Sequence, residues 1–317
     1  MCGIAGFAGS LADGPDAAER LRRMCDAIRH RGPDDSGYHV APGVAIGMRR
    51  LSIIDVAGGH QPMTNEDGTV HVVFNGEIYN YQTLRARLLA GRHRLTTSSD
   101  TETLVHLYED HGAGLARELR GMFGFAIWDD RRRRLLIARD RLGIKPLYYW
   151  PTRDGVAFAS ELRALVTLPE FPRALDPDAV VDYMAVGYVP EPRTIFAGVH
   201  KLPPGHLLEW TREGGVRIER YWSPAVAENT RITEQEAIEE TRRLLDESVR
   251  IHLLSEVPLG AFLSGGIDSS GVVATMARLS DRAVRTFSIG FAEREFDESR
   301  HAAEVATREQ IDAPAAL

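Results

Sequence analysis

Residues 2–9 read Cys-Gly-Ile-Ala-Gly-Phe-Ala-Gly, a run of small and apolar residues at the start of the chain. Its glycines let the backbone come close to a neighbouring element, and the pattern predicts a strand. A small second residue permits removal of Met1. The chain then begins with Cys2, which carries a free α-amine beside its thiol. The pKa of an α-amine is about 7.7–8.0, so this amine can accept the thiol proton near neutral pH without a distant histidine. We therefore expect Cys2 to be a nucleophile.

The composition is that of an ordinary globular protein with two domains. The chain has 317 residues, of which 44% are hydrophobic and 26% charged. A formal net charge of −7 argues against a nucleic-acid-binding protein, which usually carries a basic face. The chain has no apolar run long enough to span a membrane and no signal-peptide pattern. Because Cys2 and Cys25 are its only cysteines, we expect a reducing, cytoplasmic compartment.

Residues 70–77 combine a strand pattern with the donors that an oxyanion hole needs. The sequence Val-His-Val-Val-Phe (70–74) predicts a strand that runs into Asn75-Gly76-Glu77. A glycine leaves its amide N–H open to a ligand, and the Asn75 side chain supplies a second donor. The alternative is an Asn-Gly hairpin turn. Against that alternative, residues 79–89 predict a helix rather than a returning strand.

Two charged residues in apolar surroundings are candidates for substrate binding. Arg50 lies within 44–54, which predicts a strand, and a buried arginine needs an anion from the protein or from a substrate. Asp100 follows two serines at the start of a helix that ends at Gly112. Its carboxylate either caps this helix or receives a substrate ammonium group. The residues alone leave both alternatives open.

The rest of the pattern up to residue 160 predicts two antiparallel sheets covered by helices. One helix begins after Asp16 and carries Leu21, Met24, Cys25 and Ile28 on a single face. Strands at 122–130 and 135–140 form a hairpin whose tip is the run Arg131–Arg134. We therefore predict an α+β fold, a four-layer α/β/β/α sandwich.

Prolines mark the boundary between the domains. They are frequent between Ala174 and Trp222 and occur again just beyond. We assign residues 2–190 to a first domain, 191–232 to a connecting segment and 233–317 to the beginning of a second domain.

The second domain starts with a different pattern. Thr233–Glu236 is a capping box for a helix. The apolar run VPLGAFL (257–263) predicts a strand buried on both faces, and a helix and the strand 284–291 follow. This order predicts the opening of a parallel α/β sheet.

A glycine- and serine-rich loop, Ser264–Ser270 (SGGIDSS), lies between that first strand and its helix. Two glycines allow backbone N–H groups to converge on an anion at a helix N-terminus. The loop lacks the lysine of a Walker A motif. We expect it to bind a nucleotide pyrophosphate, with Asp268 available to hold Mg²⁺.

Several motifs in one order now resemble a known family. CGIAGF, RHRGPDDSG, RRLSIID, FNGEIYNY, SSDTE, GMFGFAIWD and RDRLGIKPLYY resemble the class II glutamine amidotransferases, which are N-terminal-nucleophile hydrolases with the α/β/β/α sandwich. The later ASEL and LSGGIDSS narrow the resemblance to glutamine-hydrolysing asparagine synthetases of the B type. The resemblance covers residues 2–306.

The resemblance implies glutamine hydrolysis by Cys2, with Asn75 and Gly76 as the oxyanion hole. The ammonia released would amidate aspartate to asparagine in an ATP-dependent reaction through β-aspartyl-AMP. The glutamine-binding residues it implies are Arg50, Leu51, Ser52, Ile53, Ile54, Asn75, Gly76, Glu77 and Asp100.

For the second domain the resemblance implies an ATP-pyrophosphatase fold of the adenine nucleotide alpha hydrolase type. ATP and Mg²⁺ would take part as co-substrate and ion, without a prosthetic group. A homodimer is compatible with the resemblance but not required by it. The ATP-binding residues it implies are Leu263, Ser264, Gly265, Gly266, Asp268, Ser269, Ser270 and Ile289.

The chain ends early for such a synthetase. Family members usually continue for some hundreds of residues, whereas this chain stops at Leu317 after REQIDAPAAL, which does not resemble the expected strand. We therefore expect a complete glutaminase half and a truncated synthetase half.

Other functions remain open. They are a stand-alone glutaminase that supplies ammonia, an amidotransferase for another carboxylate, a sugar-phosphate or phosphoribosyl amidotransferase, and a non-enzymatic fragment. The loop SGGIDSS argues against the sugar-phosphate and phosphoribosyl enzymes, which need no adenylating loop.

Overall fold

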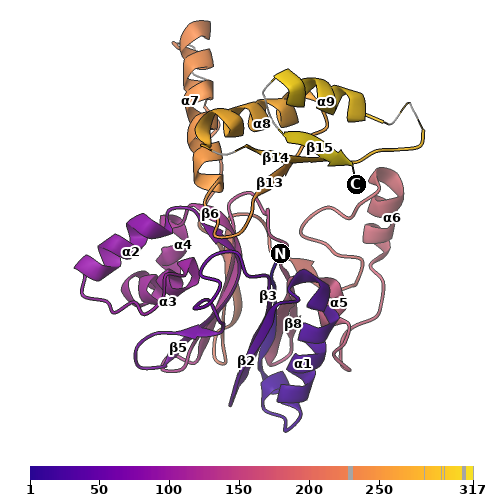
Figure 1. Cartoon of the computed structure of the whole chain (residues 1–317). Helices are drawn as coiled ribbons and strands as arrows, with labels where there is room; N and C mark the ends of the chain where they lie inside the picture. The colour runs from indigo at the N-terminus through magenta and orange to yellow at the C-terminus, as the bar shows by residue number, and fades with distance from the viewer. Residues whose placement is uncertain (228–230, 282, 294, 296, 309–311, 317) are drawn as a thin grey trace. The chain divides into compact units, whose positions relative to one another are not determined.

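The computed structural model describes residues 1–227, 231–281, 283–293, 295, 297–308 and 312–316. The chain forms two compact units, Met1–Ala225 and Val226–Leu317, and each is described by itself (Figure 1). None of the described helices has the length and the apolar character that crossing a membrane requires.

The first unit contains two six-stranded sheets in which all neighbouring strands are antiparallel. In the first sheet the order across the sheet is β10 (His200–Lys201), β8 (Tyr148–Thr152), β9 (Gly155–Ala159), β1 (Gly3–Gly9), β3 (Val44–Arg50) and β2 (Asp35–Ala41). In the second sheet the order is β12 (Gly215–Arg220), β11 (His206–Thr211), β7 (Arg134–Arg139), β6 (Gly121–Asp129), β5 (Val70–Ile78) and β4 (Met63–Thr64).

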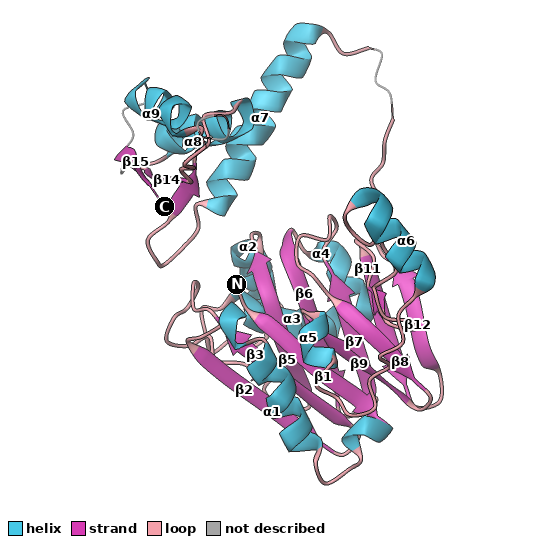
Figure 2. Ribbon diagram, turned by 90° about the vertical axis from the view of Figure 1, so that its right-hand side faces the viewer, coloured by secondary structure: helices cyan, strands magenta, loops and turns pink. Residues whose placement is uncertain are grey.

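Helices cover the outer faces of the two sheets. On the first sheet lie α1 (Ala17–Ala27) and α5 (Leu162–Leu165), and on the second lie α2 (Tyr81–Ala90), α3 (Asp100–His111) and α4 (Leu115–Glu118) (Figures 1 and 2). A further helix, α6 (Pro177–Val186), follows α5 in the sequence. The predicted four-layer α/β/β/α sandwich is therefore confirmed.

Two apolar layers explain why β1 has no polar face. Ile4 and Ala8 join a core that also holds Val73 and Trp128 of the second sheet. Ala5 and Phe7 point the other way, into a core shared with α1 and α5. Because both faces are covered, all seven residues of β1 are buried.

Local boundaries differ from the sequence prediction at two places near the site. Strand β3 ends at Arg50, so residues 51–54 form a loop rather than strand. Asn75 and Gly76 lie inside β5, where they pair with Gly124 and Phe123 of β6, and not in a turn after the strand. Away from the site, residues 191–225 of the segment 191–232 that was assigned as a connection supply β10, β11 and β12 to the sheets of the first unit.

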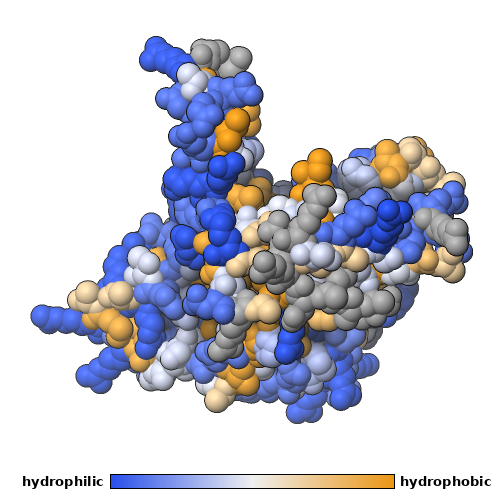
Figure 3. All heavy atoms as spheres, turned by 45° about the horizontal axis from the view of Figure 1, so that its top comes forward, coloured by the Kyte–Doolittle hydropathy of each residue, from blue (hydrophilic) through white to orange (hydrophobic). Residues whose placement is uncertain are grey.

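The second unit is a small parallel α/β arrangement. Its long helix α7 (Glu234–His252) begins at the predicted capping box of Thr233 and Glu236. The other elements are β13 (Gly260–Phe262), α8 (Ile267–Leu279), β14 (Arg285–Ser288), α9 (Ser299–Arg308) and β15 (Asp312–Ala316), and the three strands are parallel in the order β13-β14-β15. The surface of α7 is mainly hydrophilic with a smaller hydrophobic patch, and Ile238 and Leu244 are exposed on this helix (Figure 3).

Two expectations for the second unit are wrong. The run VPLGAFL is not a strand buried on both faces, because only residues 260–262 are strand and the Phe262 side chain is 69% exposed. The chain end was not expected to form a strand, yet residues 312–316 form β15, which pairs with β14 through a register shift. Residues 309–311 and 317 lie outside the described part of the chain.

Candidate active site

A cavity of about 130 Å³ opens beside Cys2 in the first unit. It forms where β1 begins, β3 ends and α3 begins, with β5 passing alongside. Its lining residues are Met1, Cys2, Arg50, Leu51, Ile53, Ile54, Gln61, Phe74, Asn75, Gly76, Glu77, Ser99, Asp100, Thr101, Met122 and Lys145. Eight of the nine glutamine-binding residues expected from the resemblance are therefore brought together, and Ser52 is not among the lining residues.

The Cys2 thiol lies against the backbone of Leu51. The Leu51 N–H donates to Sγ at 3.4 Å, and the thiol donates to the Leu51 carbonyl at 3.5 Å. Burial raises the pKa of the Cys2 thiol, whereas the Leu51 N–H and the charges of Arg50 and Lys145 oppose that rise. The site therefore holds a thiol that needs a base before it can attack.

The α-amine beside this thiol belongs to Met1 as long as Met1 is present. Burial lowers the pKa of that amine below the usual value for a chain terminus. A lowered pKa leaves a larger fraction of the amine unprotonated at neutral pH, and only the unprotonated amine can accept a proton. Removal of Met1 would transfer this role to the amine of Cys2 itself.

A buried arginine fixes the Cys2 backbone. The Nε of Arg31 donates to the Cys2 carbonyl at 2.9 Å, and its Nη1 pairs with Glu161 at 2.9 Å. The side chain of Arg31 is buried, so the pair orients Cys2, the residue just before β1, with little freedom.

Asn75 presents a buried amide into the cavity. Its side chain is 1% exposed, and neither Nδ2 nor Oδ1 has a hydrogen-bond partner. Nearly all buried polar groups in folded proteins are paired, because an unpaired one loses its interaction with water. An unpaired amide donor aimed into the pocket of the thiol is what an oxyanion hole requires.

The neighbouring Gly76 is required by packing. A Cβ at this position would lie 2.1 Å from the Met122 carbonyl oxygen and 2.8 Å from Cα of Phe123. The backbone of β6 therefore excludes any side chain at residue 76. The sequence predicted an open amide N–H at this glycine; the structure adds a second requirement, the close approach of the next strand.

Arg50 is buried at the end of β3 and holds the loop that follows. Its Nη2 donates to the carbonyls of Ile54 at 3.0 Å and Asp55 at 2.8 Å, and Nη1 donates to Val56 at 3.2 Å. These contacts place the guanidinium on the wall of the cavity. The same loop is also held at Ser52, whose backbone N–H donates to the Asp34 carboxylate at 2.9 Å.

Asp100 lies buried at the first position of α3, where Ser99 is the N-cap. Its Oδ2 accepts a hydrogen bond from Ile78 N–H at 3.0 Å. Burial raises the pKa of Asp100 to about 6, and the nearby Glu77 charge adds to that rise. An ammonium group in the cavity would pair with this carboxylate and favour its ionised form.

Two polar lining residues that the sequence did not predict, Gln61 and Lys145, have clear contacts or charge effects in the cavity. Gln61 accepts from Phe74 N–H at 2.7 Å and donates to Thr101 at 3.3 Å, so it supports the cavity wall. Lys145 is buried in the cavity, and burial lowers the pKa of its ammonium group, while the Cys2 and Glu77 charges oppose that effect. The sequence does single out Lys145, because lysine is rare in this chain. Of its 38 basic residues, only Lys145 and Lys201 are lysines.

The expected phosphate loop of the second unit lies between β13 and α8. Gly265 has φ 84°, and a Cβ there would lie 2.5 Å from the Cβ of His301. Ser264 and Ser269 bond to each other through their hydroxyls at 2.9 Å, and the Ser270 hydroxyl is buried without a partner. These groups suit a phosphate ligand at the helix N-terminus.

The other residues expected to bind ATP have different surroundings. Leu263 is buried in the small core of the second unit, whereas Asp268 and Ile289 are exposed. An exposed carboxylate in the first turn of α8 would suit a hydrated Mg²⁺ ion.

Comparisons with known proteins agree with this geometry. Residues 1–222 match the family model of the glutamine amidotransferase domain, and residues 240–313 match that of asparagine synthase. The chain is 41% identical over 308 residues to asparagine synthetase [glutamine-hydrolyzing] 1 of Bacillus subtilis, covering 96% of this chain and 48% of the relative. It is 35% identical to a putative asparagine synthetase [glutamine-hydrolyzing] 2 of Methanocaldococcus jannaschii, covering 94% of this chain and 61% of the relative.

A solved structure shares the fold. The glutamine phosphoribosylpyrophosphate amidotransferase of B. subtilis matches with a TM-score of 0.51 at 17% identity, covering 99% of this chain and 81% of that one. The chain spans about half the length of the B. subtilis asparagine synthetase, and the resemblance seen in its motifs is confirmed. On the match of residues 1–222, the chain belongs to the glutamine amidotransferases.

Proposed function

We propose that the first unit, after removal of Met1, hydrolyses the side-chain amide of glutamine to glutamate and ammonia. Its family membership and the cavity that joins Cys2, Arg50, Asn75 and Asp100 support this proposal. The observation that carries it is the buried, unpartnered amide of Asn75 in the same cavity as the Cys2 thiol.

In the proposed reaction the Cys2 α-amine takes the thiol proton, and Sγ attacks the amide carbon of glutamine. The carbonyl oxygen becomes an oxyanion, which Asn75 Nδ2 and the Gly76 N–H stabilise. Return of the proton to the amide nitrogen releases ammonia and leaves a thioester. Water, deprotonated by the same amine, attacks the thioester and releases glutamate and the free thiol.

Charge complementarity supports the orientation of the substrate. Arg50 binds the α-carboxylate of glutamine, and Glu77 and Asp100 bind its α-ammonium group. The backbone from Leu51 to Ile54 borders the substrate, with Ser52 contributing through the loop rather than its side chain. Arg50 then exchanges part of its bonding to loop carbonyls for a bidentate bond to a carboxylate.

For the whole protein we propose that the ammonia serves an ATP-dependent amidation of aspartate to asparagine, through β-aspartyl-AMP. The match of residues 240–313 to the asparagine synthase family supports this proposal. The Ser264–Ser270 loop would hold the phosphates of ATP, with Leu263 and Ile289 beside the nucleotide and Asp268 on Mg²⁺. The buried, unpaired Ser270 hydroxyl supports a ligand at this loop, whereas the close approach at Gly265 is to His301 of α9.

We further propose that the protein acts in the cytoplasm, which the free thiols of Cys2 and Cys25 support. A homodimer is compatible with this function, and size-exclusion chromatography with light scattering would test it.

The test separates the two reactions. The purified chain, with removal of Met1 verified by mass spectrometry, is incubated with glutamine alone and then with ATP, Mg²⁺ and aspartate. Glutamate release in both mixtures supports the glutaminase. Asparagine in the second mixture supports the synthetase reaction, and its absence there contradicts that reaction for this chain. No glutamate from correctly processed protein contradicts the function proposed for Cys2.

A further inference from the structure

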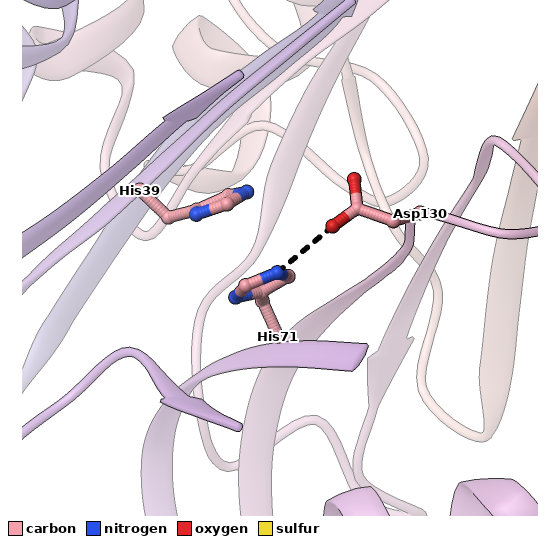
Figure 4. A group of neighbouring side chains, drawn as sticks. All are labelled: His39, His71 and Asp130. Atoms are coloured by element: carbon pink, nitrogen blue, oxygen red, sulfur yellow. Dashed lines mark hydrogen bonds and ion pairs between the residues drawn. The ribbon is translucent and has the colours of Figure 1, made fainter. Parts of the chain in front are cut away.

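A second polar cluster lies in the first unit at a distance from the glutamine cavity. It consists of His39 on β2, His71 on β5 and Asp130 just after β6 (Figure 4). His71 stands four residues before Asn75 on β5, which corresponds to about 13 Å along a strand. The cluster is therefore separate from the site of Cys2.

Both histidines face the space between the two sheets. Side chains two residues apart on a strand share a face. Ala41, two residues after His39, and Val73, two residues after His71, both pack in the core between the sheets. The histidines thus lie at the edge of that core, one from each sheet.

The three side chains converge closely. The rings of His39 and His71 stack with centroids 3.6 Å apart and an interplanar angle of 20°. His71 Nε2 lies 3.0 Å from Asp130 Oδ2 (Figure 4). One ligand atom from each residue lies within 4.8 Å of the other two.

The carboxylate of Asp130 is itself held in place. Its Oδ1 accepts a hydrogen bond from Trp128 Nε1 at 2.7 Å, and its backbone N–H donates to the Thr69 carbonyl at 2.9 Å. Trp128 pairs with His71 across β5 and β6. Such outer contacts are typical of carboxylates that hold metal ions, because they fix the direction of the oxygen lone pairs.

His39 carries the feature that points to a ligand. Its Nε2 is buried and has no hydrogen-bond partner. An imidazole nitrogen without a hydrogen-bond partner can offer its lone pair to a metal ion.

We propose that His39, His71 and Asp130 bind a divalent transition-metal ion of the zinc type, which joins the two sheets. Two imidazole nitrogens and one carboxylate oxygen are donors that Zn²⁺ accepts, and water would complete a four-coordinate site. In tetrahedral zinc sites the ligand atoms stand roughly 3.3–3.5 Å apart, so the side chains must adjust their spacing to hold the ion. The rings must also tilt out of their stack, because a metal bond lies in the plane of an imidazole.

A second group, Glu66, His93 and His106, is a weaker candidate. Glu66 is exposed and already accepts from Arg94 N–H at 3.0 Å. His93 contacts Asp110 at 3.1 Å through Nε2 and Glu109 at 3.5 Å through Nδ1. His106 Nε2 is also buried without a hydrogen-bond partner, but both ring nitrogens of His93 are engaged with carboxylates, so His93 serves as the internal control.

The experiment uses the purified full chain after dialysis against EDTA. Zn²⁺ is titrated by calorimetry, and Co²⁺ is titrated by visible absorption, which reports four-coordinate geometry. We expect one ion per chain at the cluster. His39→Gln and His71→Gln should each weaken Zn²⁺ binding at least tenfold, whereas His93→Gln should leave it unchanged. Zn²⁺ should raise the Tm of the unsubstituted chain and not that of His39→Gln.

Three outcomes would overturn the proposal. They are the absence of stoichiometric binding, binding that survives both cluster variants, and binding that His93→Gln removes. Far-UV circular dichroism verifies that the variants fold. Asp130→Asn provides a second test, because an amide oxygen can still accept from Trp128 while the anionic ligand is lost. Failure of glutamine hydrolysis would leave these metal measurements unaffected.

Discussion

The thiol of Cys2 touches both backbone polar groups of one residue, the N–H of Leu51 at 3.4 Å and its carbonyl at 3.5 Å. Leu51 opens the loop that Arg50 holds through three carbonyls. The nucleophile is therefore positioned by the same loop that borders the proposed glutamine site, and a change in that loop should alter both binding and reactivity.

Replacement of the nucleophile should abolish activity without unfolding the protein. Cys2→Ala is expected to lower glutamate release at least about 10³-fold, because no other group in the cavity can form the thioester. Circular dichroism and Tm should stay close to those of the unsubstituted chain. Cys25→Ala is the matched control, since Cys25 is buried in the core beside α1 and its thiol pKa is raised to about 12 by burial. Activity lost equally in both variants would contradict the assignment.

Asn75 should matter for catalysis more than for stability. Asn75→Ala removes an oxyanion donor, which typically lowers kcat about 10²–10³-fold. Its amide has no hydrogen-bond partner to lose, so the free energy of unfolding should change little. Asn65→Ala is the opposite control, because Asn65 bonds to Glu109 and to the backbone of Thr69 and Val70. That variant should lose stability in urea unfolding and keep kcat.

The charge of Lys145 should lower the pKa of the Cys2 thiol. Its positive charge opposes the rise in the Cys2 thiol pKa that burial causes. Lys145→Met should therefore move the pH dependence of Cys2 alkylation by iodoacetamide to higher pH. Lys201→Met should leave the profile unchanged, because the ammonium group of Lys201 donates to the Val189 carbonyl outside the cavity. Identical profiles for Lys145→Met and the unsubstituted chain would show that the lysine has no electrostatic role.

Asp100 should make stability and glutamine binding depend on pH in opposite directions. Burial raises its pKa to about 6 from the ordinary value of 3.8, so the folded protein binds the proton more tightly than the unfolded chain. This contribution to stability is present below about pH 4 and is lost as pH rises through about 6. The change in the free energy of unfolding that Asp100 causes between about pH 4 and pH 6 is roughly 3 kcal/mol. Asp100→Asn should remove it in urea unfolding measured from pH 4 to 7.

In the proposed binding mode, the α-ammonium group of glutamine pairs with the ionised carboxylate of Asp100. The KM for glutamine should therefore rise as pH falls below about 6, and Asp100→Asn should have a high KM at every pH. A KM that is flat between pH 5 and 8 in the unsubstituted chain would contradict a role for Asp100 in binding the ammonium group.

Much of the first unit follows from local patterns in the sequence. The spacing of Leu21, Met24, Cys25 and Ile28 predicted the buried face of α1, and the apolar runs on either side of Arg131–Arg134 predicted the β6–β7 hairpin. These elements are predictable because each buries its apolar side against one continuous layer. The residues of the cavity lie far apart in the sequence, so their spacing could not show that they form one site. The order of the family motifs predicted that they do.

Other features depend on distant parts of the chain. Asn75 and Gly76 stay inside β5 because Gly124 and Phe123 pair with them from β6, 40 or more residues away. Residues 51–54 form a loop, and Arg50 turns back to bond the carbonyls at the end of that loop, those of Ile54, Asp55 and Val56. The exposure of Phe262 depends on how many elements cover β13. Strand β15 forms because the edge of β14 offers backbone groups that pair with almost any sequence. No local pattern carries this information.

The carbonyl of Met122, which excludes a Cβ at Gly76, has a consequence for screening variants of this protein. Two adjacent positions should fail in a saturation library for unrelated reasons. Variants at residue 76 should disappear from the soluble fraction, whereas variants at residue 75 should remain soluble and lose turnover. A screen that scores only growth would merge the two positions, and a paired readout of expression level and glutamate release would separate them.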